Sequence, residues 1–339
     1  MKLVKCFILI LCANLVMQVA KADAKLALVK SSLLLDITSV NQQALIAVGE
    51  RGHILRKKSA QPWQLVASPS DITLTSVTAP HHNKVWAVGH QGTILMSPDA
   101  GKTWQINFKV DTDSPFMDIL FFDENHGVAI GAYGLFYRTL DGGKSWNKEV
   151  HPSILLLDDQ TYLADVKTES DELYKEEVAA LQPHLNQITL LNQNRLIMVG
   201  EFGLIATSDD KGKSWQRLDE IYVGSFFDVS AQSQVIVSGL RGHIFYSEQP
   251  LNQSTQWQSI KVSEPVNINT AIKLPDQTWR LFGNSQTYWK WSVGMQQAEP
   301  VAQLKSKAII SAAIFDQKIW LVGDKGLEQI ELPESPPIQ

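Results

Sequence analysis

One phrase recurs seven times along the chain, and it constrains the fold more than any other feature of the sequence. Each copy holds an apolar run that ends in glycine, a short turn and a second apolar run, and most copies then turn toward a tryptophan. The anchor glycines are Gly49, Gly89, Gly131, Gly200, Gly239, Gly283 and Gly323. Their spacings are 40, 42, 69, 39, 44 and 40 residues. A period of about 40 residues with several short strands per unit is typical of a β-propeller blade.

The strands of each unit add up to a four-stranded blade in all but the last copy. A further β-rich run precedes the phrase, for example at Asp71–Thr78, Pro115–Phe122, Asn186–Leu191 and Ala308–Phe315. The seventh unit ends after three strands, near Leu332. We expect Lys25–Val29 to complete it as an outer strand, which would leave the ring without an open sheet edge. The sequence therefore predicts an all-β, seven-bladed propeller over residues 25–332, with an N-terminal strand closing the last blade.

Three turns between the third and fourth strands match the pattern S/T-x-D-x-G-x-S/T-W, the Asp-box or BNR repeat. Their residues are Ser97, Asp99, Gly101 and Trp104; Thr139, Asp141, Gly143 and Trp146; and Ser208, Asp210, Gly212 and Trp215. The aspartate of such a turn accepts hydrogen bonds from backbone N–H groups, the glycine takes a positive φ, and the tryptophan packs between neighbouring sheets. We interpret these residues as structural and do not expect the aspartates to be catalytic.

The interval between Gly131 and Gly200 is about 28 residues longer than its neighbours, which indicates an insertion over residues 151–185. Within it, Asp165–Leu181 has the pattern of a short acidic amphipathic helix. Its apolar face would hold Val166, Leu173, Val178 and Leu181. Such a helix can fold against the propeller rim or serve as a docking arm for a partner, and the sequence leaves both alternatives open.

The N-terminus has the pattern of a secretory signal peptide over residues 1–22. Two lysines precede an apolar run at residues 6–19, and small residues then allow cleavage near 22–24. The run is short for a membrane span. Both cysteines lie in this segment, so the mature chain would have no thiol for a disulfide or a metal. We expect a periplasmic or secreted protein that is not inserted in the membrane after cleavage, with a proline-rich C-terminal tail at 333–339.

The repeat phrases resemble those of a known family. Seven minimal blades, the signal-like N-terminus, VG-x-x-G-x-I/L and D-x-G-K-T/S-W are similar to the bacterial relatives of the photosystem II stability and assembly factor, over about residues 36–332. The resemblance implies a non-enzymatic, chaperone-like scaffold without a cofactor. Photosynthetic members bind a membrane-protein precursor, and other relatives are often associated with exporters of the envelope. We therefore expect a periplasmic accessory factor whose partner is a membrane protein or an envelope transport complex.

The turns that follow the anchor glycines lie on the face opposite the Asp boxes. The cationic and aromatic residues of these turns are Arg51, Tyr133, Phe202, Arg241 and Lys325. Arginine and exposed aromatic side chains are favoured at the centres of interfaces. The resembled family contacts its client through an arginine patch, for which Arg51 and Arg241 are the nearest matches. The alternative is that these are ordinary solvent-facing turn residues.

Other classes of function find less support in the sequence. The net charge is −5, or −8 without the three lysines of residues 1–22, which disfavours binding of nucleic acid. The histidines form no short-spaced cluster of the kind that binds a metal. The arginines are few for a sialidase, the chain is too short for two propellers, and the carboxylate pair Asp158-Asp159 falls in the insertion. A glycan-binding or glycoside-hydrolase/sialidase-like propeller is the alternative, because such proteins share the Asp box.

Overall fold

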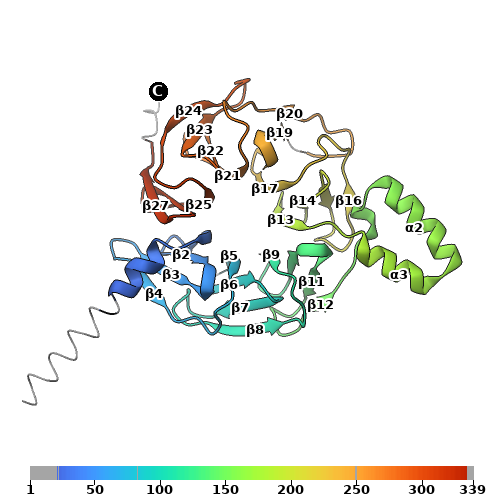
Figure 1. Cartoon of the computed structure of the whole chain (residues 1–339), viewed down its shortest axis with the longest axis horizontal. Coiled ribbons are helices and arrows are strands. Elements are labelled where there is room, and N and C mark those ends of the chain that lie inside the picture. Colours follow the sequence, from blue (N-terminus) through green and yellow to red (C-terminus); the bar gives the residue numbers. More distant parts are fainter. Residues whose placement is uncertain (1–20, 22, 82, 249, 334–339) are drawn as a thin grey trace, which may run out of the picture.

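The computed structural model describes residues 21, 23–81, 83–248 and 250–333. They form seven antiparallel sheets around a central channel (Figure 1), so the predicted seven-bladed propeller is confirmed. Six sheets have four strands and one has three. None of the described helices is long and apolar enough to cross a membrane. The predicted signal peptide and C-terminal tail fall almost wholly outside the described residues.

The strands of each blade follow one another in sequence from the channel outward. The first four blades are β1 (Leu34–Val40), β2 (Ala44–Gly49), β3 (Ile54–Lys58) and β4 (Gln64–Val66); β5 (Leu74–His81), β6 (Lys84–Gly89), β7 (Thr93–Ser97) and β8 (Gln105–Lys109); β9 (Phe116–Phe121), β10 (Gly127–Gly131), β11 (Phe136–Thr139) and β12 (Asn147–Lys148); and β13 (Leu185–Leu190), β14 (Leu196–Gly200), β15 (Ile205–Ser208) and β16 (Gln216–Arg217). The last three are β17 (Phe226–Ala231), β18 (Gln234–Gly239), β19 (Ile244–Glu248) and β20 (Gln258–Ser259); β21 (Ile268–Lys273), β22 (Trp279–Gly283), β23 (Thr287–Trp291) and β24 (Glu299–Gln303); and β25 (Ile309–Phe315), β26 (Lys318–Gly323) and β27 (Gly326–Glu331).

A close backbone contact explains why the anchor position is glycine in all seven blades. Each anchor glycine ends a second strand and lies against the carbonyl group of the residue that precedes the first strand. A Cβ atom on Gly49 would overlap the carbonyl oxygen of Leu33, and one on Gly323 would overlap that of Ala308. The next backbone N–H, that of Glu50 in the first blade, donates to the same carbonyl at 3.1 Å, and the equivalent bond forms in every blade. The repeated phrase thus encodes a repeated contact.

Each first strand carries a β-bulge beside this contact. In the first blade Leu34 pairs with Gly49 and Asp36 pairs with Val48, so Leu35 is the extra residue. The register shifts at the equivalent place in the other six blades. A bulge breaks the strict alternation of side chains along a strand, so two successive side chains can face the channel.

The ring closes without the expected N-terminal strand. Residues 23–30 are helical and the last sheet holds only β25, β26 and β27, so the prediction that Lys25–Val29 forms a strand is wrong. Alanine, leucine and lysine are strong helix formers, and the apolar pattern of this short segment fits a helix as well as a strand. Leu26 and Val29 pack in a cluster with Trp63 and Trp320 of the first and last blades. Packing of side chains between the first and last blades therefore closes the propeller ring.

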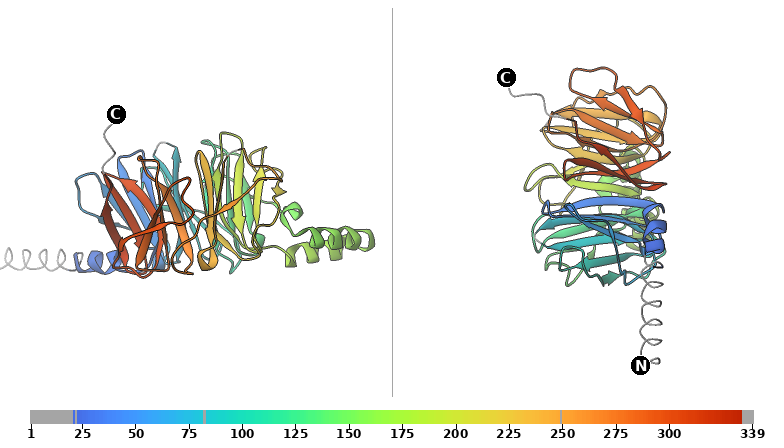
Figure 2. Two further views of the ribbon diagram at one scale, coloured as in Figure 1. Left: turned by 90° about the horizontal axis from the view of Figure 1, so that it is seen from above. Right: turned by 90° about the vertical axis from the view of Figure 1, so that its left-hand side faces the viewer.

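The insertion forms a helical hairpin that projects from the rim (Figures 1 and 2). Its helices are α2 (Leu157–Glu169) and α3 (Asp171–Ala180), whereas we expected one helix over Asp165–Leu181. The difference arises at Ser170, which has extended backbone dihedral angles and whose hydroxyl accepts a hydrogen bond from Leu173 N at 3.2 Å. A serine at this position caps the second helix and separates it from the first.

The glycine contact generates a stability prediction. In Gly239→Ala the new methyl group would overlap the Ser225 carbonyl oxygen, and we expect a loss of about 2–3 kcal/mol in the free energy of unfolding. Gly294→Ala is the matched control, because a Cβ there meets nothing within 4 Å and only its φ of 92° is unfavourable. Its expected cost is about 1 kcal/mol. Equal losses in urea titrations of the two variants would contradict the contact.

A candidate binding site at the channel mouth

Two successive residues of every first strand line a central cavity of about 500 Å³. The bulged residues are Leu35, Thr75, Met117, Asn186, Phe227, Asn269 and Ile310. The residues that follow them are Asp36, Ser76, Asp118, Gln187, Asp228, Thr270 and Ser311. We call this second set the polar ring, because all seven of its side chains are polar.

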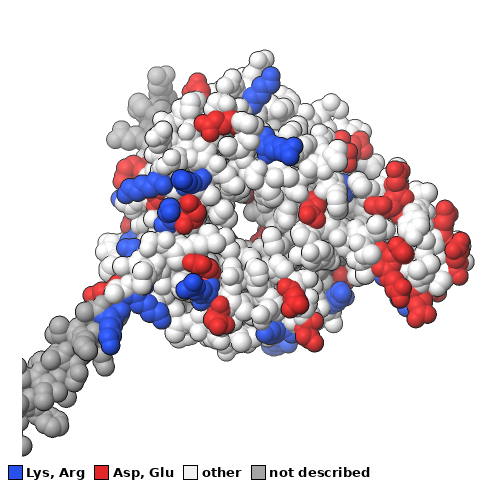
Figure 3. Space-filling model, viewed as in Figure 1, with Lys and Arg blue, Asp and Glu red and all other residues white. Residues whose placement is uncertain are grey.

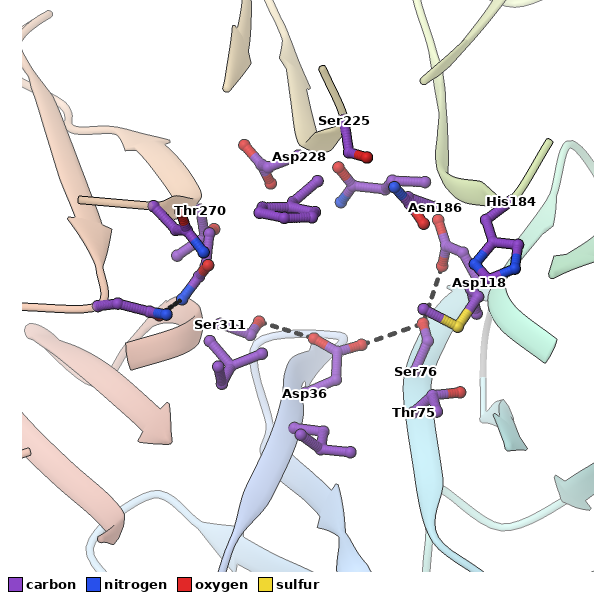
Figure 4. A pocket seen from close by; sticks show the side chains of 18 of the residues that line it. Asp36, Thr75, Ser76, Asp118, His184, Asn186, Ser225, Asp228, Thr270 and Ser311 are labelled. Atoms are coloured by element: carbon purple, nitrogen blue, oxygen red, sulfur yellow. Dashed lines mark hydrogen bonds between the residues drawn. The ribbon is translucent and has the colours of Figure 1, made fainter. Parts of the chain in front are cut away.

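The polar ring connects neighbouring blades by hydrogen bonds (Figure 4). Asp36 accepts from Ser311 Oγ of the last blade at 2.7 Å and from Val77 N of the second blade at 2.7 Å. Ser76 Oγ lies 3.1 Å from Asp36 Oδ2 and 2.8 Å from Asp118 Oδ1. A hydroxyl group has one proton, so both contacts are satisfied when one of the two carboxyl groups is protonated and donates to Ser76.

Burial favours the protonated form of the carboxyl groups in the polar ring. It raises the pKa of Asp118 and of Asp228 to about 7, although backbone N–H groups such as that of Ile188 oppose the shift. Burial also raises the pKa of Asp36, against the hydrogen bonds that Asp36 accepts. The negative charge of Asp36 raises the pKa of Asp118 further. The polar ring is therefore best satisfied when part of its acids are neutral.

The cavity opens on the face that carries the anchor-glycine turns, and Figure 3 looks down this opening. Glu201 and Asn284, each directly after an anchor glycine, belong to its lining. His184 Nδ1 lies 3.7 Å from Glu201 Oε1, and the ring of Tyr133 packs edge-on against His184 with centroids 4.4 Å apart. An aromatic and acidic rim thus flanks the mouth at the third and fourth blades.

Amide and hydroxyl groups make up most of the polar lining, beside the four acids Asp36, Asp118, Asp228 and Glu201. Five amide side chains contribute to it: Asn186, Gln187, Asn267, Asn269 and Asn284. No lysine or arginine of the described chain is part of it. Amides donate and accept together, so they pair with backbone groups of an extended peptide or with hydroxyl groups, while Met117 and Phe227 add apolar surface.

All five residues of the predicted partner face lie in anchor-glycine turns. Tyr133 is 68% exposed and Phe202 is 51% exposed. Arg51, Tyr133, Phe202 and Arg241 have φ angles of 54°, 55°, 54° and 55°, whereas Lys325 has no positive φ. A left-handed conformation costs a residue other than glycine about 1 kcal/mol. Four exposed side chains are thus presented in a backbone conformation that glycine would adopt without strain.

Most other arginines join neighbouring elements. Arg56 Nε donates to the carbonyl oxygen of Ala100 at 2.7 Å, which ties the first blade to the Asp-box turn of the second. Arg138 reaches the carbonyl oxygen of Gly212 in the same way, and Arg195 bonds to the loop of the fifth blade. These guanidinium groups are occupied at the periphery of the ring, away from the cavity.

The Asp-box residues bond within their own turns. Asp141 accepts from Ser145 Oγ at 2.6 Å and from Ser145 N at 2.9 Å, and Thr139 Oγ1 donates to it at 2.9 Å. These bonds, with that of the Ser145 hydroxyl first, lower the pKa of Asp141 to about 2. Asp99 and Asp210 make equivalent bonds. We propose a structural role for these residues, because their carboxylates are used inside the turns.

No residue of the polar ring is among the site residues predicted from the sequence. A signal was present, since an aspartate interrupts an apolar strand in LLDITSV, FMDILF and FFDVSA. The three aspartates stand at the same repeat position, Asp36, Asp118 and Asp228, which would have marked a shared polar surface at the channel.

Sequence comparison finds relatives over part of the chain. No family model matches. The photosystem II assembly lipoprotein Ycf48 of Picosynechococcus sp. is 28% identical over 194 residues, which cover 50% of this chain and 54% of that protein. The photosystem II assembly protein Ycf48 of Thermosynechococcus vestitus is 40% identical over 57 residues, 16% of each chain. The chain thus spans about half of the length of the first relative and less of the second.

Solved structures share the fold over nearly the whole chain. The structure of YCF48 bound to D1 peptide has a TM-score of 0.66 at 16% identity and covers 90% of this chain and 95% of that one. YCF48 from Cyanidioschyzon merolae has a TM-score of 0.67 at 14% identity, with 88% and 95% covered. The WD40 propeller domain of Doa1 scores 0.63 at 12% identity, with 88% and 93% covered. At these identities the likeness shows the fold.

The raised pKa values predict a stability that falls with rising pH. In the folded state Asp118 and Asp228 lose their protons near pH 7, but in the unfolded chain they do so near pH 4, so their stabilising effect is present at low pH and is lost through about pH 7. Between about pH 5 and about pH 8, the free energy of unfolding of wild type should fall by about 2–3 kcal/mol relative to that of Asp228→Asn. Asp71→Asn changes an exposed residue, so its free energy of unfolding should depend on pH in the same way as that of wild type. If the free energies of unfolding of all three proteins changed in parallel with pH, the raised pKa of Asp228 would be refuted.

Proposed function

We propose that this chain, whose sequence and fold support a photosystem II assembly factor-like family, is a non-catalytic scaffold for a membrane protein complex. In this proposal the anchor-glycine face binds a segment of a membrane protein during its assembly or operation. An envelope transporter such as an exporter is the partner that we favour.

The observation that carries the proposal is the set of four strained, exposed turn residues around an open cavity. Arg51, Tyr133, Phe202 and Arg241 hold left-handed conformations on one face. Non-glycine residues in other turns, such as Ala100 and Lys211, also have positive φ angles, and the anchor-glycine turns differ from these in carrying arginine and aromatic side chains there. Arginine and aromatic side chains are the groups that dominate binding at protein interfaces.

The charges of this face support a protein partner with an oriented fit. Lys305, Lys307 and Lys325 are exposed at the same end of the seventh blade, where basic side chains gather in Figure 3. Across the ring, the helical hairpin is covered by acidic side chains. A partner whose own charges are distributed in the opposite sense would dock in one orientation, because complementary potentials fix register.

The glycan alternative has a weaker basis in the cavity. A sialidase needs arginines that converge on the channel, whereas Arg56, Arg138 and Arg195 are bonded to neighbouring turns. The amides of the cavity are compatible with binding a neutral sugar. Saturable binding to an oligosaccharide panel, lost on substitution of Asn186 or Asn269, would support that alternative over a protein partner.

We further propose that the protein acts in the periplasm. The signal-like pattern of residues 1–22 supports this location, as does the role in membrane-protein assembly proposed here.

Charge reversal on the face tests the function. We expect Arg51→Glu and Arg241→Glu each to lower capture of an identified membrane protein from detergent-solubilised membranes by about 10-fold, because each replaces a favourable charge by a repulsive one. Lys102→Glu, on the opposite face, is the control. Undiminished capture by both face variants would sink the assignment of this face, and failure of wild type to capture any membrane protein would sink the proposed function.

The left-handed turns make a second, separable prediction. Phe202→Gly should leave the free energy of unfolding unchanged or raise it by up to about 1 kcal/mol, because glycine removes the strain and costs some chain entropy. The same substitution should weaken partner binding, since it removes an exposed aromatic ring. Chemical denaturation and the capture assay, run on one preparation, check both parts. A marked loss of stability would show that the phenyl ring of Phe202 stabilises the fold instead.

A further inference from the structure

We propose that the groove at the base of the helical hairpin is a second docking site, which accepts a partner segment that carries apolar side chains flanked by lysine or arginine. The groove has a volume of about 730 Å³ and lies between the start of α2 and the end of the fourth blade. The inference does not rest on the proposed function, because it concerns other residues and another partner chemistry.

Hydrogen bonds between the base of the hairpin and the propeller hold the walls of the groove in place. Arg217 donates to the carbonyl oxygen of Ile154 at 2.9 Å and also to that of Phe202. Ser153 Oγ donates to the carbonyl oxygen of Trp215 at 2.8 Å, and Ile154 is buried in the core of the third and fourth blades. These contacts fix the base of the hairpin on the propeller, so the walls of the groove hold their places without a ligand.

Two large apolar side chains stand open at the groove. Leu157 at the start of α2 is 76% exposed, and Val223 on the opposite wall is 70% exposed. The hairpin meanwhile buries its own apolar residues Leu163 and Val178 in a separate small cluster. Leu157 is therefore not needed for the packing of the hairpin.

The charges around the groove indicate which partner covers it. Asp158, Asp219 and Glu220 are exposed in its lining and form no ion pair with another described residue. Arg217 is the one cation among the described residues of the lining, and its guanidinium group is bonded to backbone carbonyl groups. Beyond the groove the hairpin adds further acids, as Figure 3 shows. Those further acids are Asp159, Asp165, Glu169, Asp171, Glu172, Glu176 and Glu177, against Lys167 and Lys175.

This combination selects among possible occupants. An anionic membrane surface would be repelled by the acids. In a two-fold symmetric dimer, a second copy of this chain would bring another acidic hairpin to the same place. A basic segment with apolar side chains fits both features, since its apolar groups would cover Leu157 and Val223 while its cations meet the acidic rim.

The test uses four short fluorescent peptides in which charge and apolarity vary independently: lysine with leucine, lysine with serine, glutamate with leucine, and glutamate with serine. Binding to the full chain is measured by fluorescence anisotropy. The lysine–leucine peptide should bind most tightly, with an affinity that falls as salt is added. Leu157→Ser and Val223→Ser should each weaken it about 5-fold, and so should Asp219→Asn combined with Glu220→Gln.

Matched controls keep the result specific to the groove. Val301→Ser replaces an apolar residue that is 45% exposed on β24, and Asp71→Asn removes an exposed acid elsewhere. Neither should change the affinity by more than about 2-fold. Equal binding of the lysine–serine peptide, or groove variants that bind like wild type, would overturn the proposal. So would a concentration-dependent dimer that Val223→Ser abolishes, because it would assign the groove to a second copy.

Discussion

The carbonyl group that lies against each anchor glycine is the contact on which the rest of this propeller depends. It brings the end of the second strand against the start of the first, and any side chain at the glycine would separate them. The bulge beside it turns two residues of each first strand toward the channel. Both of them line the cavity, and the second also bonds to the neighbouring blade, as Asp36 does with Ser311 and Val77. A single backbone contact, repeated seven times, thus positions both the wall of the channel and the ring that holds the blades together.

Much of this could be predicted from the sequence, because the contact leaves a glycine at a fixed repeat position. Blade number and strand order follow from seven glycines and from the strands around them. Ring closure did not follow, because residues 23–30 satisfy a helical and an extended pattern equally, and only packing against Trp63 and Trp320 decides between them. The hairpin was anticipated in part, but Ser170 divides it into two helices by a local cap that the apolar pattern does not reveal. An aspartate at one repeat position of three first strands marks part of the polar ring, but the bulges that turn the ring toward the channel carry no signature of their own in a single sequence.

Different parts of the same blades stabilise the fold and form the proposed binding face. At the periphery, Arg56 and Arg138 bond to the turns of the next blades, and the Asp-box carboxylates bond within their turns. At the channel, the buried carboxyl groups are neutral in part and join blades from within. The backbone of the anchor-glycine turns bonds within the blades, whereas the side chains of Tyr133 and Phe202 remain exposed there. A rigid ring that presents strained, exposed side chains on one face is suited to binding, since little ordering remains to be done when a partner arrives.

The proposed function requires that the anchor-glycine face contacts a membrane protein. Site-specific photocrosslinking in intact cells of the native host tests it most directly, with a photoreactive amino acid placed at Phe202 on this face or at exposed Lys144 on the opposite face. We predict a crosslink to an integral membrane protein from position 202 and none to that protein from position 144. A crosslink from position 144 alone, or the same product from both positions, would contradict it.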